Sequence, residues 1–147
     1  MFWIWLIEDS RLDHDYYFRG GWGLFTGSGS GDLGTDLFLA VMPNSPNACV
    51  AVYENSGSKP SFTMGTDPWA IDRPLIQVIV RSSEGDYPAA RDKAQAIRVL
   101  LGSLIDVTIS GVKIMRVESQ GSVIPMGEDE NLRSMISINF ECMISYE

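Results

Sequence analysis

The stretch GEDENLR, residues 127–133, holds the densest group of side chains that could do chemistry. Calcium loops alternate oxygen ligands and add a bidentate Glu at a fixed spacing, and this stretch has neither. Paired carboxylates can act as general acid and base, but neighbours in one loop seldom converge on one atom. The pattern therefore favours a solvated turn in which Asp129 or Asn131 binds nearby backbone N–H groups. Arg133 would then hold a carboxylate through its planar guanidinium, within the chain or on a neighbouring chain.

The other reactive side chains lack the partners that catalysis or metal binding requires. The only histidine, His14, lies between two aspartates, and no second ligand or base is placed near it by spacing. Cys49 and Cys142 stand in apolar runs without CxxC or histidine spacing, which predicts buried thiols. A disulfide remains the alternative if their strands are neighbours. We therefore predict no catalytic residue, cofactor or metal, and keep a small hydrolase with Asp129 or Glu130 as base as the enzymatic alternative.

Composition narrows the class of protein. The chain has 147 residues, enough for one domain with a real core, and its formal net charge is −8. An acidic chain is a poor ligand for nucleic acid or an anionic membrane. The apolar start MFWIWLI ends at Ile7, far short of the roughly 20 residues that span a bilayer. It also lacks the features of a signal peptide, so we expect a soluble protein made in the cytoplasm.

Periodicity predicts the elements that must position these side chains. Residues 75–81 (LIQVIVR) form a β-branched strand, and residues 82–102 hold a helix capped near Asp86 with Pro88 in its first turn. Ser110-Gly111 separates two strand-like runs, which indicates a hairpin. The final run alternates, with apolar residues on one face: Ile136, Ile138, Phe140, Cys142, Ile144 and Tyr146.

The fold class expected from this order is α+β, a single mostly antiparallel sheet packed by one main helix and one or two short helices. Residues 1–18 are expected to form a short helix, with a strand as the alternative because of their aromatic content. Residues 37–42 are expected to form a short apolar turn that Asp36 caps. Residues 19–35 are rich in Gly and Ser and lack the Lys-Ser/Thr pair of a phosphate-binding loop. Long connections are expected at 55–74 and 121–134. The predicted organisation is an N-terminal segment and Gly-rich loop at 1–35 followed by the α+β domain at 36–147.

Three segments, in order and spacing, resemble the minor capsid or tail terminator family of long-tailed bacteriophages: DLFLAVMPNSPNACVAVYEN, RPLIQVIVRSSEGDYPAARDKA and PMGEDENLRSMISINFE. The similarity covers roughly residues 33–147, while the first 32 residues depart from the family pattern. The positions that carry it are Leu37, Phe38, Met42, Pro43, Pro46, Arg73, Pro74, Gln77, Val78, Tyr87, Ala90, Gly127, Asp129, Asn131, Arg133, Asn139 and Phe140.

The resemblance implies a structural virion protein, made and assembled in the host cytoplasm. It would form a ring, typically hexameric, that caps the tail tube, stops its polymerisation and joins the tail to the head connector. Its partners would be further copies of itself, the tail-tube protein and the connector, while DNA passes through the lumen without specific binding. The subunit-interface candidates are Trp69, Arg73, Asp129, Asn131 and Arg133. The nearest rival is another neck or tail-tube ring protein, which would keep stacking where a terminator stops.

Overall fold

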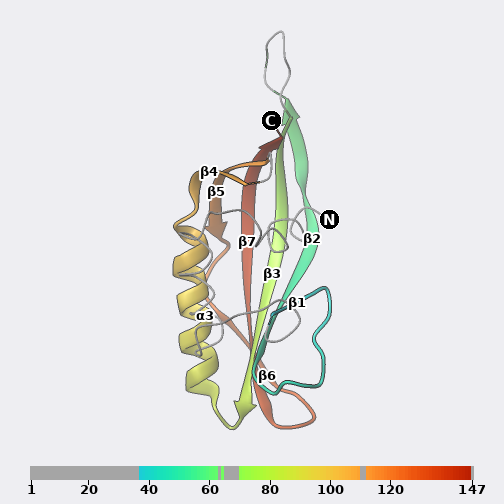
Figure 1. Ribbon diagram of the computed structural model, residues 1–147, viewed down its shortest axis with the longest axis vertical. Helices are drawn as coiled ribbons and strands as arrows, with labels where there is room; N and C mark the ends of the chain where they lie inside the picture. Colours follow the sequence, from blue (N-terminus) through green and yellow to red (C-terminus); the bar gives the residue numbers. More distant parts are fainter. Residues whose placement is uncertain (1–36, 63, 65–69, 110–111, 147) are drawn as a thin grey trace.

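The computed structural model describes residues 37–62, 64, 70–109 and 112–146. They form one sheet and one helix, arranged as drawn in Figure 1. The sheet order is β1-β2-β3-β7-β5-β4, and β6 pairs with β7. The elements are β1 (Leu37–Leu39), β2 (Cys49–Phe62), β3 (Ala70–Glu84), α3 (Tyr87–Gly102), β4 (Ile105–Ile109), β5 (Val112–Ser119), β6 (Ile124–Glu128) and β7 (Arg133–Tyr146).

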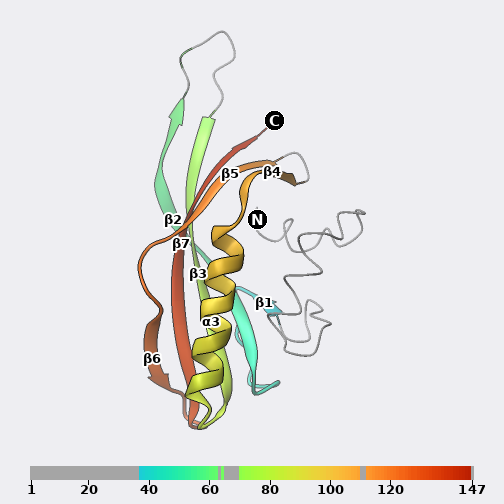
Figure 2. The ribbon, with the colours of Figure 1, turned by 90° about the vertical axis from the view of Figure 1, so that its left-hand side faces the viewer.

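The described elements agree broadly with the expected α+β class. β1 pairs with β2 in parallel, and the other pairings of the described strands are antiparallel. Figure 2 looks at the sheet from the helix side and shows α3 lying along the strands. The helix contacts β7 most extensively and also packs on β3 and β5. The expected helix at residues 1–18 and the boundary near residue 35 lie outside the described residues, so both remain predictions.

The main helix follows the rules that predicted it. The Asp86 carboxylate accepts a hydrogen bond from the Ala89 N–H at 3.3 Å, and a proline stands in the first turn. Ala90, Ala94 and Ile97 are buried against the sheet because residues three and four apart share one helix face. The predicted helix is thus confirmed, and it covers one face of the sheet.

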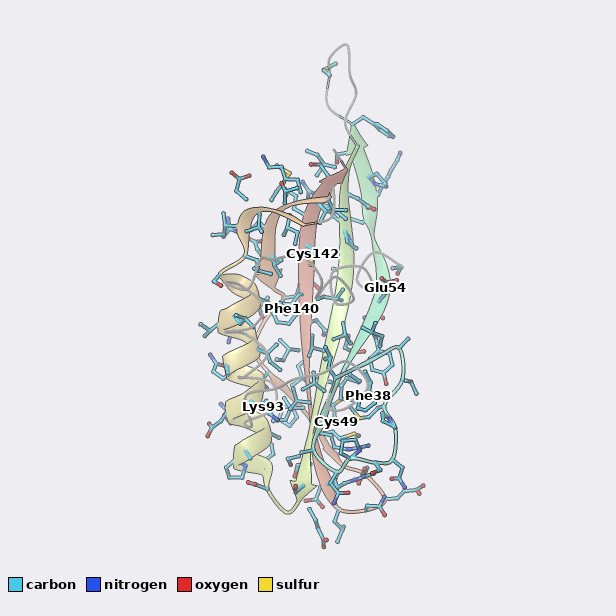
Figure 3. All side chains as sticks on the ribbon, in the orientation of Figure 1. Phe38, Cys49, Glu54, Lys93, Phe140 and Cys142 are labelled. Atoms are coloured by element: carbon cyan, nitrogen blue, oxygen red, sulfur yellow. The ribbon has the colours of Figure 1, made fainter. Side chains whose placement is uncertain are left out.

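The alternation of β7 is also confirmed. Its even-numbered residues from Ile136 to Ile144 belong to the core cluster with the inner face of α3. Phe140 and Cys142 lie on the side of β7 that faces the helix (Figure 3). Tyr146 ends the strand, but its side chain is outside the described set. The core is therefore built between α3 and one sheet face.

Both cysteines are buried thiols, as predicted, and they are not joined in a disulfide. Figure 3 shows Cys49 and Cys142 at well-separated heights of the sheet. Burial raises the pKa of the Cys142 thiol to about 12. A thiol with so high a pKa carries almost no thiolate near neutral pH, so it is a poor nucleophile.

Three expected loops or turns are wrong. Residues 55–74 are largely the β2–β3 hairpin, and residues 124–128 form β6 rather than part of a loop. The residues of β2 beyond Tyr53 and all residues of β6 are exposed, so the alternation that reveals a half-buried strand is missing there. The expected turn at 37–42 begins as β1, because Leu37 is buried against β2 and extends the sheet. The proposed cap for that turn, Asp36, lies outside the described residues.

Gly57 is required by the close approach of two strands. The β2–β3 register shifts between Asn55 and Ser58, and a Cβ at Gly57 would lie 2.1 Å from the Arg73 carbonyl oxygen. We expect Gly57→Ala to cost about 1–3 kcal/mol of unfolding free energy, because backbone must move to admit the methyl group. Gly102→Ala is the matched control, since nothing lies within 4 Å of its added Cβ. Chemical denaturation measures both, and equal midpoints would show that the bulge tolerates a side chain.

Candidate functional site

Residues 43–47, the sequence PNSPN, belong to the loop between β1 and β2, at the edge of the sheet away from α3 (Figure 1). Two buried arginines hold this segment, Arg81 from β3 and Arg133 from β7, which are 3% and 4% exposed. We call this arrangement the arginine clamp. The two strands are neighbours in the sheet, so both guanidinium groups reach the same segment.

Arg81 binds the segment entirely through carbonyl oxygens. Its Nε donates to the Asn47 carbonyl at 2.9 Å, and its Nη2 donates to the carbonyls of Pro43 and Pro46, both at 2.6 Å. Proline offers a carbonyl acceptor but no backbone N–H, so a proline-bearing segment leaves acceptors that need donors. A guanidinium supplies donors only, which makes it a suitable partner.

Arg133 joins the segment to the GEDENLR turn. Its Nη1 donates to the Asn44 carbonyl at 2.6 Å, and its Nη2 donates to Asn44 Oδ1 at 2.8 Å. The same guanidinium binds Asp129 Oδ2 through Nε at 2.8 Å and Nη2 at 2.6 Å. A weaker bond reaches Asn47 Oδ1 at 3.3 Å. One planar fork therefore ties the turn, the segment and β7 together.

Asp129 is fully engaged inside the turn. Its Oδ1 accepts the backbone N–H groups of Asn131 at 2.9 Å and Arg133 at 3.0 Å, the geometry expected of an Asx turn. The Arg133 side chain, supported by these backbone donors, lowers the pKa of Asp129 to about 2. Arg133 was expected to pair with a carboxylate either within the chain or on a neighbouring chain, and the structure shows the pairing within the chain. A contact of these residues with a neighbouring chain remains a prediction.

This pairing predicts how stability changes with pH. Because the Asp129 pKa is lower in the folded chain than the ordinary 3.8, the carboxylate stabilises the fold fully above pH 4. That contribution is lost as pH falls from about 4 toward 2. We expect Asp129→Asn to lose less stability over this window than the wild type. Thermal melts at several pH values test this, and parallel curves for both proteins would contradict it.

The site does not support the hydrolase alternative. A carboxyl with a pKa of about 2 is a weak base at neutral pH, and both Asp129 oxygens already accept hydrogen bonds. Glu130 is exposed in the turn. The described part of the chain contains no group of three or more His, Cys, Asp or Glu side chains suited to a metal ion.

The five interface candidates are only partly brought together. Asp129, Asn131 and Arg133 meet in the turn, and the Asn131 side-chain amide donates to Asn44 Oδ1 at 3.2 Å. Arg73 lies elsewhere, on β3 opposite Ser58, and its buried Nε has no hydrogen-bond partner. Trp69 lies outside the described residues.

Sequence reasoning missed half of the clamp. The sequence pattern predicts Arg81 only as the last residue of a strand, and it gives no role to Asn44 or Asn47. A usable signal was present, because two closely spaced prolines leave carbonyls that an arginine at a strand end can bind. The arginine clamp fixes the backbone of residues 43–47 next to the sheet, which is a structural role.

These features define an α+β domain with a surface turn held by the arginine clamp and a projecting β2–β3 hairpin. No helix among the described residues is long and apolar enough to cross a membrane. The sequence profile of the bacteriophage tail terminator proteins matches residues 25–146. The chain belongs to this family, and it is a structural component of a phage tail rather than an enzyme.

One solved structure shares the fold at low sequence identity. A chain from the virion of a native gene transfer agent particle matches with a TM-score of 0.50 and 17% identity, covering 76% of this chain and 80% of that one. A second solved structure gives a TM-score of 0.48 at 14% identity, covering 90% and 91% of the two chains. A search of curated proteins finds no match.

Proposed function

We propose that this protein forms a closed ring on the last ring of the tail tube, with six subunits as the family resemblance implies. The ring stops tube polymerisation and offers its other side to the head–tail connector. The observation that carries the proposal is the tail terminator match over residues 25–146. On this proposal the protein is assembled in the host cytoplasm and resides at the neck of the virion.

Two surfaces are proposed to make the contacts. One is the β2–β3 hairpin, whose β2 residues 54–62 are all exposed and so contribute little to the core of a single chain. The other is the β6–β7 turn, which the arginine clamp holds in one shape before any partner binds. Preorganised surfaces bind with a smaller entropic cost, which suits a ring that must stop growth reliably. Trp69, Arg73, Asp129, Asn131 and Arg133 are the proposed contact residues.

Tube growth tests the proposed function. Tail-tube protein from the same phage is allowed to polymerise with and without this protein, and tube lengths are measured by negative-stain electron microscopy. We expect added protein to shorten the tubes in proportion to its dose and to appear as a ring at tube ends. Unchanged tube lengths, or tubes formed by this protein alone, would point to the rival neck or tube role.

The lumen is expected to let DNA slide without binding it. A ring of six copies, each with a formal charge of −8, carries −48. Such a ring repels duplex DNA over a Debye length of roughly 10 Å at 0.1 M salt. We expect no gel shift of duplex DNA with purified protein even at low salt, where attraction to phosphates is strongest. Tight, salt-sensitive binding would instead indicate a connector that grips DNA.

A further inference from the structure

The β2–β3 hairpin carries an apolar tip on a polar shaft. From Glu54 to Ser61 the β2 sequence is ENSGSKPS, and every one of these residues is exposed. The shaft resists strand pairing, because Lys59 and Pro60 are residues that protect an open sheet edge. At the tip, Phe62 is 70% exposed and Met64 is fully exposed. Two large apolar side chains at the end of a projecting arm form a knob that lacks an apolar environment in the described chain.

A shallow apolar hollow lies on the outer side of α3. Its volume is about 490 Å³, and it lies over the second half of the helix. Val99 is 66% exposed there, unlike the inward residues Ala94 and Ile97, which are buried against the sheet. The lining residues are Asp92, Gln95, Ala96, Val99, Leu100 and Ser103.

The knob and the hollow lie on different parts of the molecule. Strands β7, β5 and β4 follow β3 across the sheet, and α3 packs mainly on β7. Figure 1 shows the hairpin rising along the long axis beyond the sheet, while α3 flanks the opposite side of the molecule. One chain therefore cannot place its own tip in its own hollow while the hairpin stays paired.

We propose that the hairpin tip, Phe62 and Met64, docks in the α3 hollow of the next copy of this chain. This inference rests on the proposed ring and identifies one of its subunit contacts. Because knob and hollow are different surfaces, the contact is head-to-tail, and repeating it generates a ring when the rotation closes.

Charge favours a second copy as the occupant. The hollow carries Asp92 at its rim, and the arm carries Lys59 three residues before Phe62. The helix as a whole bears Arg91, Lys93 and Arg98 against one aspartate, in a chain whose net charge is −8. The helix that carries the hollow therefore has three positive charges against one negative charge, which favours the approach of another copy whose net charge is −8.

Disulfide trapping on assembled rings tests this contact. Met64→Cys and Val99→Cys are introduced together, and rings on tail tubes are oxidised mildly and run on a non-reducing gel. The native cysteines are buried and do not compete. The matched control replaces Val99→Cys by Ile105→Cys, because Ile105 is 61% exposed just beyond α3 and outside the hollow. We expect a ladder of linked chains only for the Met64–Val99 pair, and linked dimers when the two single variants are co-assembled.

The outcomes separate this inference from the proposed function. Capped tubes without a ladder above the Ile105 control overturn the docking contact and leave the terminator role intact. A cross-link within one chain also overturns it. Tubes that are never capped, even by the wild type, contradict the proposed function itself. As a second variant, Val99→Glu should weaken capping by about tenfold or more, since burying Phe62 and Met64 next to a carboxylate forfeits their transfer free energy.

Discussion

Arg133→Ala is expected to lower the unfolding free energy by about 3–5 kcal/mol, the range found when one partner of a buried charged network is removed. Arg133 is 4% exposed, and its loss removes the donors to the Asn44 carbonyl and to Asp129 Oδ2. Asn44 Oδ1 also loses one of its two donors and keeps the Asn131 amide. The PNSPN segment would lose one of its two anchors and the turn its link to that segment. Urea denaturation measures the change.

Two further variants make this result specific. Arg133→Lys should restore little, because an ammonium cannot present the fork that binds Asp129 and Asn44 together. Arg91→Ala, at an exposed position of α3, should stay within about 0.5 kcal/mol of the wild type. If Arg133→Ala unfolds at the same urea concentration as the wild type, the hydrogen bonds of Arg133 do not stabilise the fold, which would contradict this prediction.

Phe140→Ala is the second large effect, and we expect it to cost about 3–5 kcal/mol. Phe140 is completely buried in the cluster between β7 and α3, so truncation removes transfer free energy and leaves a cavity. Asn139→Ser is the control on the adjacent, half-buried position of the opposite face, and it should cost little unless that face meets another subunit. Thermal and urea unfolding compare the two, and similar small losses would contradict a core centred on Phe140.

The core of the fold could be predicted because its elements bury one face. In α3 the buried residues Ala90, Ala94 and Ile97 recur at the helical period, and in β7 they recur at period two. The Asp86 cap and the following proline fixed where the helix begins. The apolar period and the capping residues of an element are visible within a short stretch of sequence, so these elements can be predicted from a single sequence.

The hairpin and the arginine clamp could not be predicted, because they depend on contacts between residues far apart in the sequence. The β2–β3 hairpin exposes both faces of β2 beyond Tyr53, so its residues look like those of a loop. The arginine clamp joins residues 34 to 89 positions apart, from Arg81 to Asn47 and from Arg133 to Asn44. The turn chemistry of Asp129 was predictable because its partners lie two and four residues away.

The location and copy number of this chain in intact virions test the central claim most directly. Cryo-electron microscopy of the neck, combined with quantitative gel densitometry, gives both. The terminator account predicts one closed ring of this chain, six copies as the resemblance implies, between the tail tube and the head connector. A single copy per particle, or copies distributed along the whole tube, would contradict it.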